Sequence, residues 1–312
     1  MRIVLAPMEG LADVHLRRLI TAQGGFDWVV SEFVRVLDHL YPDRVFLSRC
    51  PELLNGGRTE SGTPLRVQLL GNHLDAMAAN AQRAVELGSY GIDLNFGCPS
   101  KTVNRHRGGA VLLQEPETLY QIVHAVRSAL PASVVVSAKM RLGFDDTSLM
   151  LENAAAIEAA GATEITVHAR TKAQRYLPPA HWDELARIRE HIRIPLIANG
   201  DIFSVEDYRR CTAIAGTPDV MLGRGAVMQP MLAQQIRANQ STEAPWRGMG
   251  ALLNGFWEEL RNSASTREAV GRVKQWISYL RQSYPEAETL WHAIRTETNP
   301  QNITALLGEM TR

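Results

Sequence analysis

The sequence predicts an α/β protein, a (β/α)8 TIM barrel followed by a small C-terminal helical bundle. Short apolar or β-branched runs recur along the chain up to about residue 230, and longer amphipathic stretches lie between them. Eight such units are enough to close a parallel barrel. Beyond residue 230 the alternation stops, and only helical patterns follow. We therefore expect a barrel first and a helical domain after it.

The expected barrel strands are short and rich in valine, isoleucine and leucine. They span 3–6, 28–31, 66–70, 91–95, 134–139, 164–168, 195–198 and 219–222. The stretches between them place apolar residues at three- and four-residue spacing, which is typical of amphipathic helices. These stretches include 74–87, 116–130, 147–160, 182–191 and 205–215.

The C-terminal part has helical spacing only. Its expected helices span 248–261, 266–284, 286–296 and 300–310. The link 241–245 is polar and contains a proline, which is typical of a domain boundary. We therefore predict a barrel domain over residues 1–240 and a helical domain over residues 241–312.

Composition excludes several classes of protein. Apolar residues make up 45% and charged residues 21%, values of an ordinary globular protein. The net charge is zero, so nucleic-acid binding would depend on local patches. Three cysteines without CxxC spacing argue against a disulfide framework and against a zinc site. Met1 leads directly into the first expected strand, and no apolar run reaches membrane-spanning length. We expect a cytoplasmic protein.

Polar, charged or glycine residues follow almost every expected strand. In a TIM barrel the functional site lies at these C-terminal strand ends. A barrel with a purely structural role would not need such residues at all eight ends, so we predict a site there. The residues are Pro7, Met8, Glu9, Glu32, Phe33, Gln68, Asn95 to Cys98, Lys139, Arg141, His168, Arg170, Asn199, Gly200, Asp201, Gly223, Arg224 and Gly225.

The loops after the last two strands predict a phosphate site. Gly200 and Gly223 each separate a strand from the next helix, where free backbone N–H groups and the helix dipole favour an anion. TIM barrels commonly bind phosphate at these two loops. Each glycine alone could serve turn geometry only, but the pair, together with Arg224, favours phosphate.

Lys139 and His168 end neighbouring strands and should face the same mouth. A lysine that closes an apolar strand is costly to bury without a partner. It suits an electron-rich group such as the pyrimidine edge of a reduced flavin. His168 could donate to a phosphate or to the ring, or could equally be a core histidine. Gln68 and Asn95 could hydrogen-bond a planar heterocycle.

Cys98 follows a buried strand on a Gly-Cys-Pro turn, which places its thiol toward a cleft. That position is poor for an inert core thiol. A nucleophile would need a general base, and no histidine has a sequence context that marks it as the partner. The remaining role for Cys98 is that of a general acid that protonates a carbon atom. Cys50 and Cys211 lack this context. The basic run Lys101, Arg105, His106 and Arg107 predicts a mobile loop fitted to an anion.

These motifs resemble those of the tRNA-dihydrouridine synthases, which are FMN-dependent barrels with a helical C-terminal domain. The matching segments occur in the family's order through the whole barrel. They are 6–10, the strand around Gln68, 95–101, 139–143, 167–171, 197–201 and 223–225. The sequence departs from the family at Phe96, where relatives often carry a small or sulfur-containing residue, and at Ala169, which replaces a common glycine.

The resemblance implies the cofactors and the chemistry. NADPH would reduce FMN, flavin N5 would pass hydride to C6 of a uridine, and Cys98 would protonate C5. The implied FMN contacts are Pro7, Met8, Glu9, Gln68, Lys139, His168, Asn199, Gly200, Asp201, Gly223 and Arg224.

The segments 31–36, 50–53 and 272–281 resemble the subfamily that acts on uridine 16 of the D-loop. By this resemblance Arg35, Arg272, Lys274 and Arg295 would orient the tRNA. Arg267, Lys274 and Arg281 recur every seven residues, which places a basic stripe on one helix face, although a solvated face would look the same. The uridine must leave its stack to reach a barrel mouth. We expect Asn95, Lys101, Arg141 and Tyr176 to meet it there.

Two other functions stay open at this stage. One is an FMN-dependent enzyme for a free pyrimidine, which would need neither the helical domain nor the basic run at 101–107. The other is a non-catalytic barrel that binds folded RNA and would contain no flavin. The neutral charge and the absence of an obvious apolar surface stripe favour a monomer.

Overall fold

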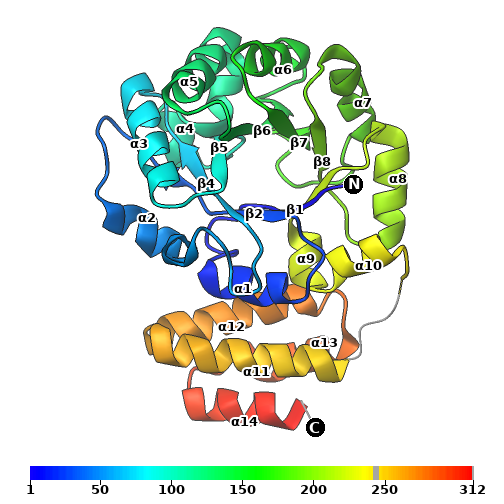
Figure 1. The fold of residues 1–312 in the computed structure, drawn as a ribbon. Coiled ribbons are helices and arrows are strands. Elements are labelled where there is room, and N and C mark those ends of the chain that lie inside the picture. Colours follow the sequence, from blue (N-terminus) through cyan, green and yellow to red (C-terminus); the bar gives the residue numbers. More distant parts are fainter. Residues whose placement is uncertain (242–245, 311–312) are drawn as a thin grey trace.

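The computed structural model describes residues 1–241 and 246–310, without the side chain of residue 310. Nearly all of the predicted link at 241–245 therefore lies outside the described residues. The described strands form a closed parallel barrel, with helices around it and a layer of further helices at one side (Figure 1). In the described ranges no helix combines the length and apolarity needed to cross a membrane.

The sheet has nine strands in the order β2-β1-β9-β8-β7-β6-β5-β4-β3, and β2 also pairs with β4 to close the barrel. All pairings are parallel. The strands are β1 Ile3–Leu5, β2 Trp28–Val30, β3 Val34–Arg35, β4 Leu65–Leu70, β5 Gly91–Phe96, β6 Val135–Gly143, β7 Glu164–Thr171, β8 Leu196–Asn199 and β9 Val220–Leu222. All eight predicted strands are confirmed, and β3 is an addition that pairs with β4 alone.

Two strands run further than predicted. β6 was expected to end at Lys139 and β7 at His168, but they end at Gly143 and Thr171. The arginines that follow are buried and paired inside the protein, so they do not end the strands. Arg141 donates to backbone carbonyls, and Arg170 is ion-paired with Asp201.

Helices cover the outside of the barrel. They are α1 Val14–Ala22, α2 Asp43–Arg49, η1 Pro51–Asn55, α3 Leu74–Glu86, α4 Lys101–Arg105, η2 Gly109–Gln114, α5 Pro116–Ala129, α6 Met150–Ala159, α7 Trp182–His191, α8 Val205–Ala215, α9 Arg224–Met228 and α10 Leu232–Ala238. All five predicted barrel helices are present. The main core lies between these helices and the sheet, whereas Val4, Trp28, Val30 and Met221 belong to a smaller cluster inside the barrel.

The basic run after Cys98 is not the loop that we expected. Residues Lys101–Arg105 form α4. Asn104 donates from its side chain to the carbonyls of Cys98 (2.9 Å) and Ser100 (2.7 Å), which ties this helix to the turn before it. Arg107 forms an ion pair with Glu115 at 2.6 Å. The side chain of Arg107 is therefore already neutralised, while Lys101 is exposed.

Within residues 246–310 the C-terminal part forms four helices: α11 Trp246–Ser263, α12 Thr266–Leu280, α13 Pro285–Ile294 and α14 Pro300–Met310. α12 ends before the predicted 284, because the residue before Pro285 is driven out of helical geometry. α11 and α12 lie against α1 and α9 of the barrel, and α14 lies on the far side (Figure 1). The Phe256 and Trp276 rings pack edge to face at 4.9 Å, and the Trp276 indole donates to the carbonyl of Val227 in α9 (3.0 Å).

Candidate active site

A cavity of about 1060 Å³ opens at the C-terminal ends of the strands. Most of the predicted site residues line it; Phe96, Arg170, Arg272, Lys274 and Arg295 do not. The lining includes Pro7, Met8, Glu9, Arg35, Gln68, Asn95, Cys98, Lys101, Lys139, Arg141, His168, Tyr176, Asn199, Gly200, Asp201, Gly223 and Arg224. The barrel thus brings together side chains that are far apart in the sequence, as the rule for strand ends predicts.

Cys98 lies in the turn after β5. The side-chain oxygen of Asn95, near the end of this strand, accepts hydrogen bonds from the backbone N–H groups of Gly97 (2.9 Å) and Cys98 (3.0 Å). The Cys98 carbonyl in turn accepts from the backbone N–H of Ala110 (3.1 Å). Gly109 has φ +67°, and a Cβ there would lie 2.8 Å from the Cys98 carbonyl oxygen. The turn is therefore fixed from both sides, and glycine is required beside it.

The three cysteines differ in exposure. Cys98 is partly exposed in the cavity, whereas Cys50 and Cys211 are fully buried, as we expected for structural cysteines. Burial raises the pKa of the Cys98 thiol above its ordinary value. At neutral pH the thiol therefore keeps its proton. A protonated thiol that faces a cavity suits a general acid better than a nucleophile or a metal ligand.

Cationic side chains gather around the other side of the cavity. Lys139 lies on β6, and burial followed by the nearby charge of Arg141 lowers its pKa to about 8. It forms no hydrogen bond or ion pair with any residue in the described ranges. Burial, and then the charges of Arg141 and Lys139, lower the pKa of His168 well below its ordinary value, so its imidazole is neutral. Lys139 and His168 lie close to Arg141, Arg170 and Arg224, and this cationic surrounding favours an anionic ligand.

Asp201 lines the cavity and also holds two arginines there. Its carboxylate is ion-paired with Arg170, approaches Arg224 at 3.5 Å and accepts the backbone N–H of Ala180 (3.1 Å). The carboxylate therefore holds the two arginines in place. Gly200, before it, has φ +125°, which favours glycine.

Arg141 is almost fully buried at the cavity wall. Its guanidinium donates to the carbonyls of Gly97 (2.9 Å), Thr171 (3.0 Å) and Arg175 (2.9 Å). It also lies over the Tyr176 ring, 5.2 Å from the centroid, as does Arg224. Arg141 thus joins the Cys98 turn to the loop after β7, and the half-exposed Tyr176 closes that side of the mouth.

The three predicted residues of the helical part lie outside the cavity. Arg272 donates to the carboxylate of Asp13 and is largely buried between α12 and the barrel. Lys274 donates to the carbonyl of Arg295 (3.1 Å), and the Arg295 side chain is exposed. The basic stripe is only partly free, because Arg281 is paired with Glu288 at 3.1 Å.

Sequence reasoning missed several residues of the site. Gln275 and Tyr279 of α12 line the cavity, although nothing in their spacing marks them. Asp93 lies in the middle of β5, is 1% exposed, and bonds to Gln68. The sequence could have identified Asp93, because a carboxylate within an apolar strand is buried and must have hydrogen-bond partners.

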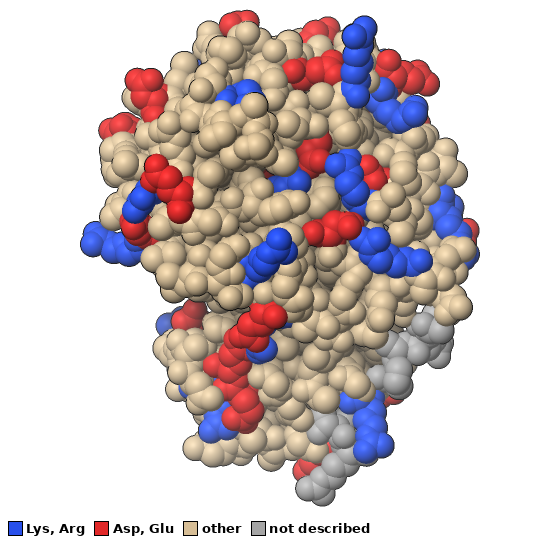
Figure 2. All heavy atoms as spheres, in the orientation of Figure 1, with Lys and Arg blue, Asp and Glu red and all other residues tan. Residues whose placement is uncertain are grey.

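Figure 2 shows basic and acidic side chains interspersed over the visible face, in line with the zero net charge. No cluster of three or more histidine, cysteine or acidic side chains suited to a metal ion occurs in the part of the chain that the structure describes.

The sequence model of the family "Dihydrouridine synthase (Dus)" matches residues 4–303. The chain belongs to the dihydrouridine synthase family. It is 49% identical to the tRNA-dihydrouridine(16) synthase of Pseudomonas syringae pv. tomato, with all of both chains covered. It is 48% identical to the protein of that name from Shewanella oneidensis, with 99% of this chain and 98% of the relative covered. The corresponding protein of Neisseria meningitidis serogroup B is 45% identical, with 100% and 95% covered.

Solved structures share the barrel of this dihydrouridine synthase at low identity. Histamine dehydrogenase from Rhizobium sp. 4-9 matches with a TM-score of 0.57 and 13% identity, over 82% of this chain and 48% of that one. A 2-naphthoyl-CoA reductase matches with the same TM-score and identity, over 77% and 50%. These likenesses show the fold. Family membership makes the protein an oxidoreductase of the flavin-dependent class.

Proposed function

We propose that this dihydrouridine synthase reduces uridine 16 in the D-loop of tRNA to 5,6-dihydrouridine, with FMN as its cofactor and NADPH as the reductant. The observation that carries the proposal is that the Cys98 thiol lines the same cavity as Lys139, which has no hydrogen-bond or ion-pair partner in the described residues. The choice of uridine 16 rests on the relatives. They are named tRNA-dihydrouridine(16) synthase and align with this chain over nearly their full length.

The residues present fit FMN. The cavity of about 1060 Å³ has room for the cofactor and for a base beside it. The Gly200 and Gly223 loops, with His168 and Arg224, would hold the phosphate. Lys139 and Gln68 would meet the pyrimidine edge of the ring, and Pro7, Met8, Glu9 and Asn199 would complete the contacts. Lys139 has no partner in the described protein, so a ligand that becomes anionic on reduction would supply the missing charge.

The proposed chemistry needs one hydride and one proton. When bound, the flavin supplies the hydride that enters uridine at C6. The Cys98 thiol then breaks its S–H bond as a C–H bond forms at C5, which leaves a thiolate. Water restores the thiol before the next turnover. The raised pKa of Cys98 favours this cycle, since the thiol is present at neutral pH and is regained readily.

The uridine must leave the stacked D-loop to reach the cavity, at a cost of a few kcal/mol. Contacts to the RNA backbone would offset that cost. Arg35, Lys101 and Tyr176 line the mouth, and the exposed Arg295 lies on the helical part. We assign residues 1–240 to the catalytic domain and 241–312 to tRNA recognition. The enzyme would act as a cytoplasmic monomer.

The test is NADPH oxidation by the flavin-loaded enzyme with an unmodified tRNA transcript, followed by mapping of the reduced base. We expect dihydrouridine at position 16 and no turnover with a transcript that has cytidine there. Reduction at another uridine would contradict the position. Turnover with free uracil but not with tRNA would move the protein to the small-pyrimidine enzymes, and an inactive, flavin-free protein would support an RNA-binding barrel.

A further inference from the structure

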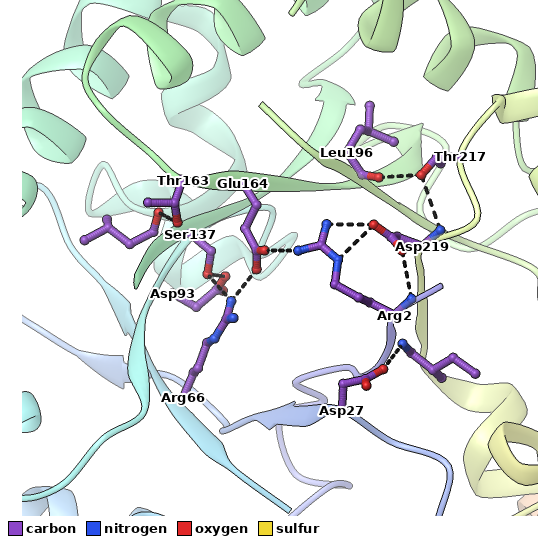
Figure 3. A network of polar contacts seen from close by, with 12 residues as sticks. Arg2, Asp27, Arg66, Asp93, Ser137, Thr163, Glu164, Leu196, Thr217 and Asp219 are labelled. Carbon is purple, nitrogen blue, oxygen red and sulfur yellow. Dashed lines mark hydrogen bonds and ion pairs between the residues drawn. The ribbon is translucent and has the colours of Figure 1, made fainter. Parts of the chain in front are cut away.

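Asp93 lies on β5 with its carboxylate inside the barrel, and none of the roles above includes it. The residue is 1% exposed and both of its oxygens are bonded. The Ser137 hydroxyl donates to one oxygen (2.7 Å), and the Gln68 side-chain amide donates to the other (2.7 Å). All three residues stand at one level of the barrel, because Gln68 pairs with Asp93 and Asp93 with Ser137 across adjacent strands. Figure 3 shows Asp93 beside Ser137, with Arg66 and Glu164 nearby.

From this level a line of hydrogen bonds leads to the Cys98 turn. The Gln68 side-chain oxygen accepts from the amide nitrogen of Asn95 (2.7 Å). The Asn95 side-chain oxygen accepts from the backbone N–H of Cys98 (3.0 Å) and of Gly97 (2.9 Å). Two side-chain amides therefore connect the buried carboxylate to the turn that holds the thiol.

The groups at the two ends of this hydrogen-bonded chain determine how the Gln68 and Asn95 amides are oriented. An ionised carboxylate only accepts hydrogen bonds, and a backbone N–H only donates. A reversed Gln68 would turn its oxygen toward Asp93. A reversed Asn95 would turn its NH₂ group toward the two backbone N–H groups. With Asp93 ionised, one orientation of both amides satisfies every group.

We propose that Asp93 is a positioning residue for the proton donor. Its ionised carboxylate anchors the Gln68 end of the Gln68–Asn95 amide pair in the orientation that the backbone N–H groups of the turn also require, and that pair holds the Cys98 turn in the geometry from which the thiol reaches C5. The proposal rests on the proposed role of Cys98. Asp93 itself is not among the residues that line the cavity.

The cost of keeping this carboxylate supports a functional role. Burial raises the pKa of Asp93 to about 6, against the hydrogen bonds from Gln68 and Ser137 and the charges of Arg66 and Lys139. The group is ionised at neutral pH although its surroundings disfavour the charge. A neutral side chain would avoid this cost, so retention of the charge needs a reason beyond packing.

The first test measures the reactivity of Cys98, which requires no catalysis. Cys50 and Cys211 are fully buried, so alkylation by iodoacetamide followed by mass spectrometry reports on Cys98, and the other two cysteines report any unfolding. Asp93→Leu removes both acceptors. We expect it to raise the alkylation rate of Cys98 at pH 7.5 by about tenfold, the size expected when one or two hydrogen bonds are lost. Asp93→Asn should give a smaller rise in the same direction.

The second test separates the two half-reactions. In single turnover, we expect Asp93→Leu to slow reduction of uridine in tRNA by about ten- to a hundredfold, relative to reduction of the flavin by NADPH in the same sample. Glu164→Gln is the matched control, because Glu164 is also a buried carboxylate in the barrel interior but bonds to Arg2 and Arg66 instead of Gln68 (Figure 3). It should leave both Cys98 measurements at wild-type values.

Three results would overturn the proposal. One is a wild-type alkylation rate and a wild-type ratio of half-reactions in Asp93→Leu. Another is equal effects in Glu164→Gln, which would indicate a general structural role. If Asp93→Leu does not fold, wild-type values in Asp93→Asn would be decisive, since the charge would then be dispensable. A wild-type enzyme that reduces no uridine would instead refute the proposed function, and the alkylation test would still stand.

Discussion

Arg272 of α12 and Asp13 of the barrel form an ion pair, with the guanidinium donating to one carboxylate oxygen at 2.6 and 3.0 Å. The same guanidinium donates to the carbonyls of Gly10 and Leu11, both at 2.8 Å. The other oxygen of Asp13 accepts the backbone N–H of Leu16 (3.0 Å) and so begins α1. The helical part is thus fastened to the loop that continues from the predicted FMN contacts 7–9.

Arg272→Ala should therefore destabilise the fold, because it removes four hydrogen bonds to the barrel and leaves Asp13 without its cation. We expect a loss of about 2–3 kcal/mol in the free energy of unfolding. Urea denaturation measures it. Arg267→Ala is the control, since Arg267 is exposed on the same helix. Equal stability of the two variants would show that the ion pair contributes little.

The pH dependence of catalysis should reveal Lys139. Its pKa is lowered to about 8 from an ordinary value near 10.5, so the side chain is cationic below pH 8 and becomes neutral as the pH rises through that value. We expect flavin reduction by NADPH to slow above about pH 8, because the cation that faces the reduced ring is lost.

Stopped-flow measurements between pH 6 and 10 test this expectation. Lys139→Arg should move the decline to higher pH, since a guanidinium keeps its proton, and Lys139→Met should be slow throughout. An unchanged alkaline limb in Lys139→Arg would assign the titration to another group.

The tRNA contacts should appear in the salt dependence of binding. Each phosphate contact adds roughly 0.7–0.9 to the slope of log affinity against log salt concentration. We expect Lys274→Ala and Arg295→Ala each to lower the slope by about that amount. Arg187→Ala, on α7 of the barrel, should leave it unchanged. Slopes equal to the wild type in all three variants would remove Lys274 and Arg295 from the tRNA interface.

Crowding at the Cys98 turn can be tested with two glycines of similar backbone geometry. Gly109 has φ +67°, and a Cβ there would lie 2.8 Å from the Cys98 carbonyl oxygen. Gly56 has φ +63° and open space around it. Both alanine variants carry the backbone strain of about 1 kcal/mol, but only Gly109→Ala should also slow uridine reduction. Equal activity of the two variants would mean that the turn tolerates displacement.

The strand pattern predicted the barrel well because periodicity is local. The site could also be predicted as a set, since parallel strands bring their carboxyl ends together wherever they occur in the chain. Predictions from the local sequence pattern failed where a side chain has its hydrogen-bond partner far away along the chain. The ends of β6 and β7 were wrong, because Arg141 and Arg170 are satisfied by groups about 30 residues away along the chain. The structural roles of Arg272 and Asp201 were likewise beyond sequence reasoning, since each depends on a partner placed by the tertiary fold.

Single-turnover kinetics of Cys98→Ala test the central claim most directly. The flavin of this variant should be reduced by NADPH at the wild-type rate, because the thiol has no part in that step. Reduction of uridine 16 in tRNA should then fall by about 10²–10⁴-fold, the usual contribution of a general acid. Uridine reduction at the wild-type rate by the reduced variant would show that Cys98 is not the proton donor.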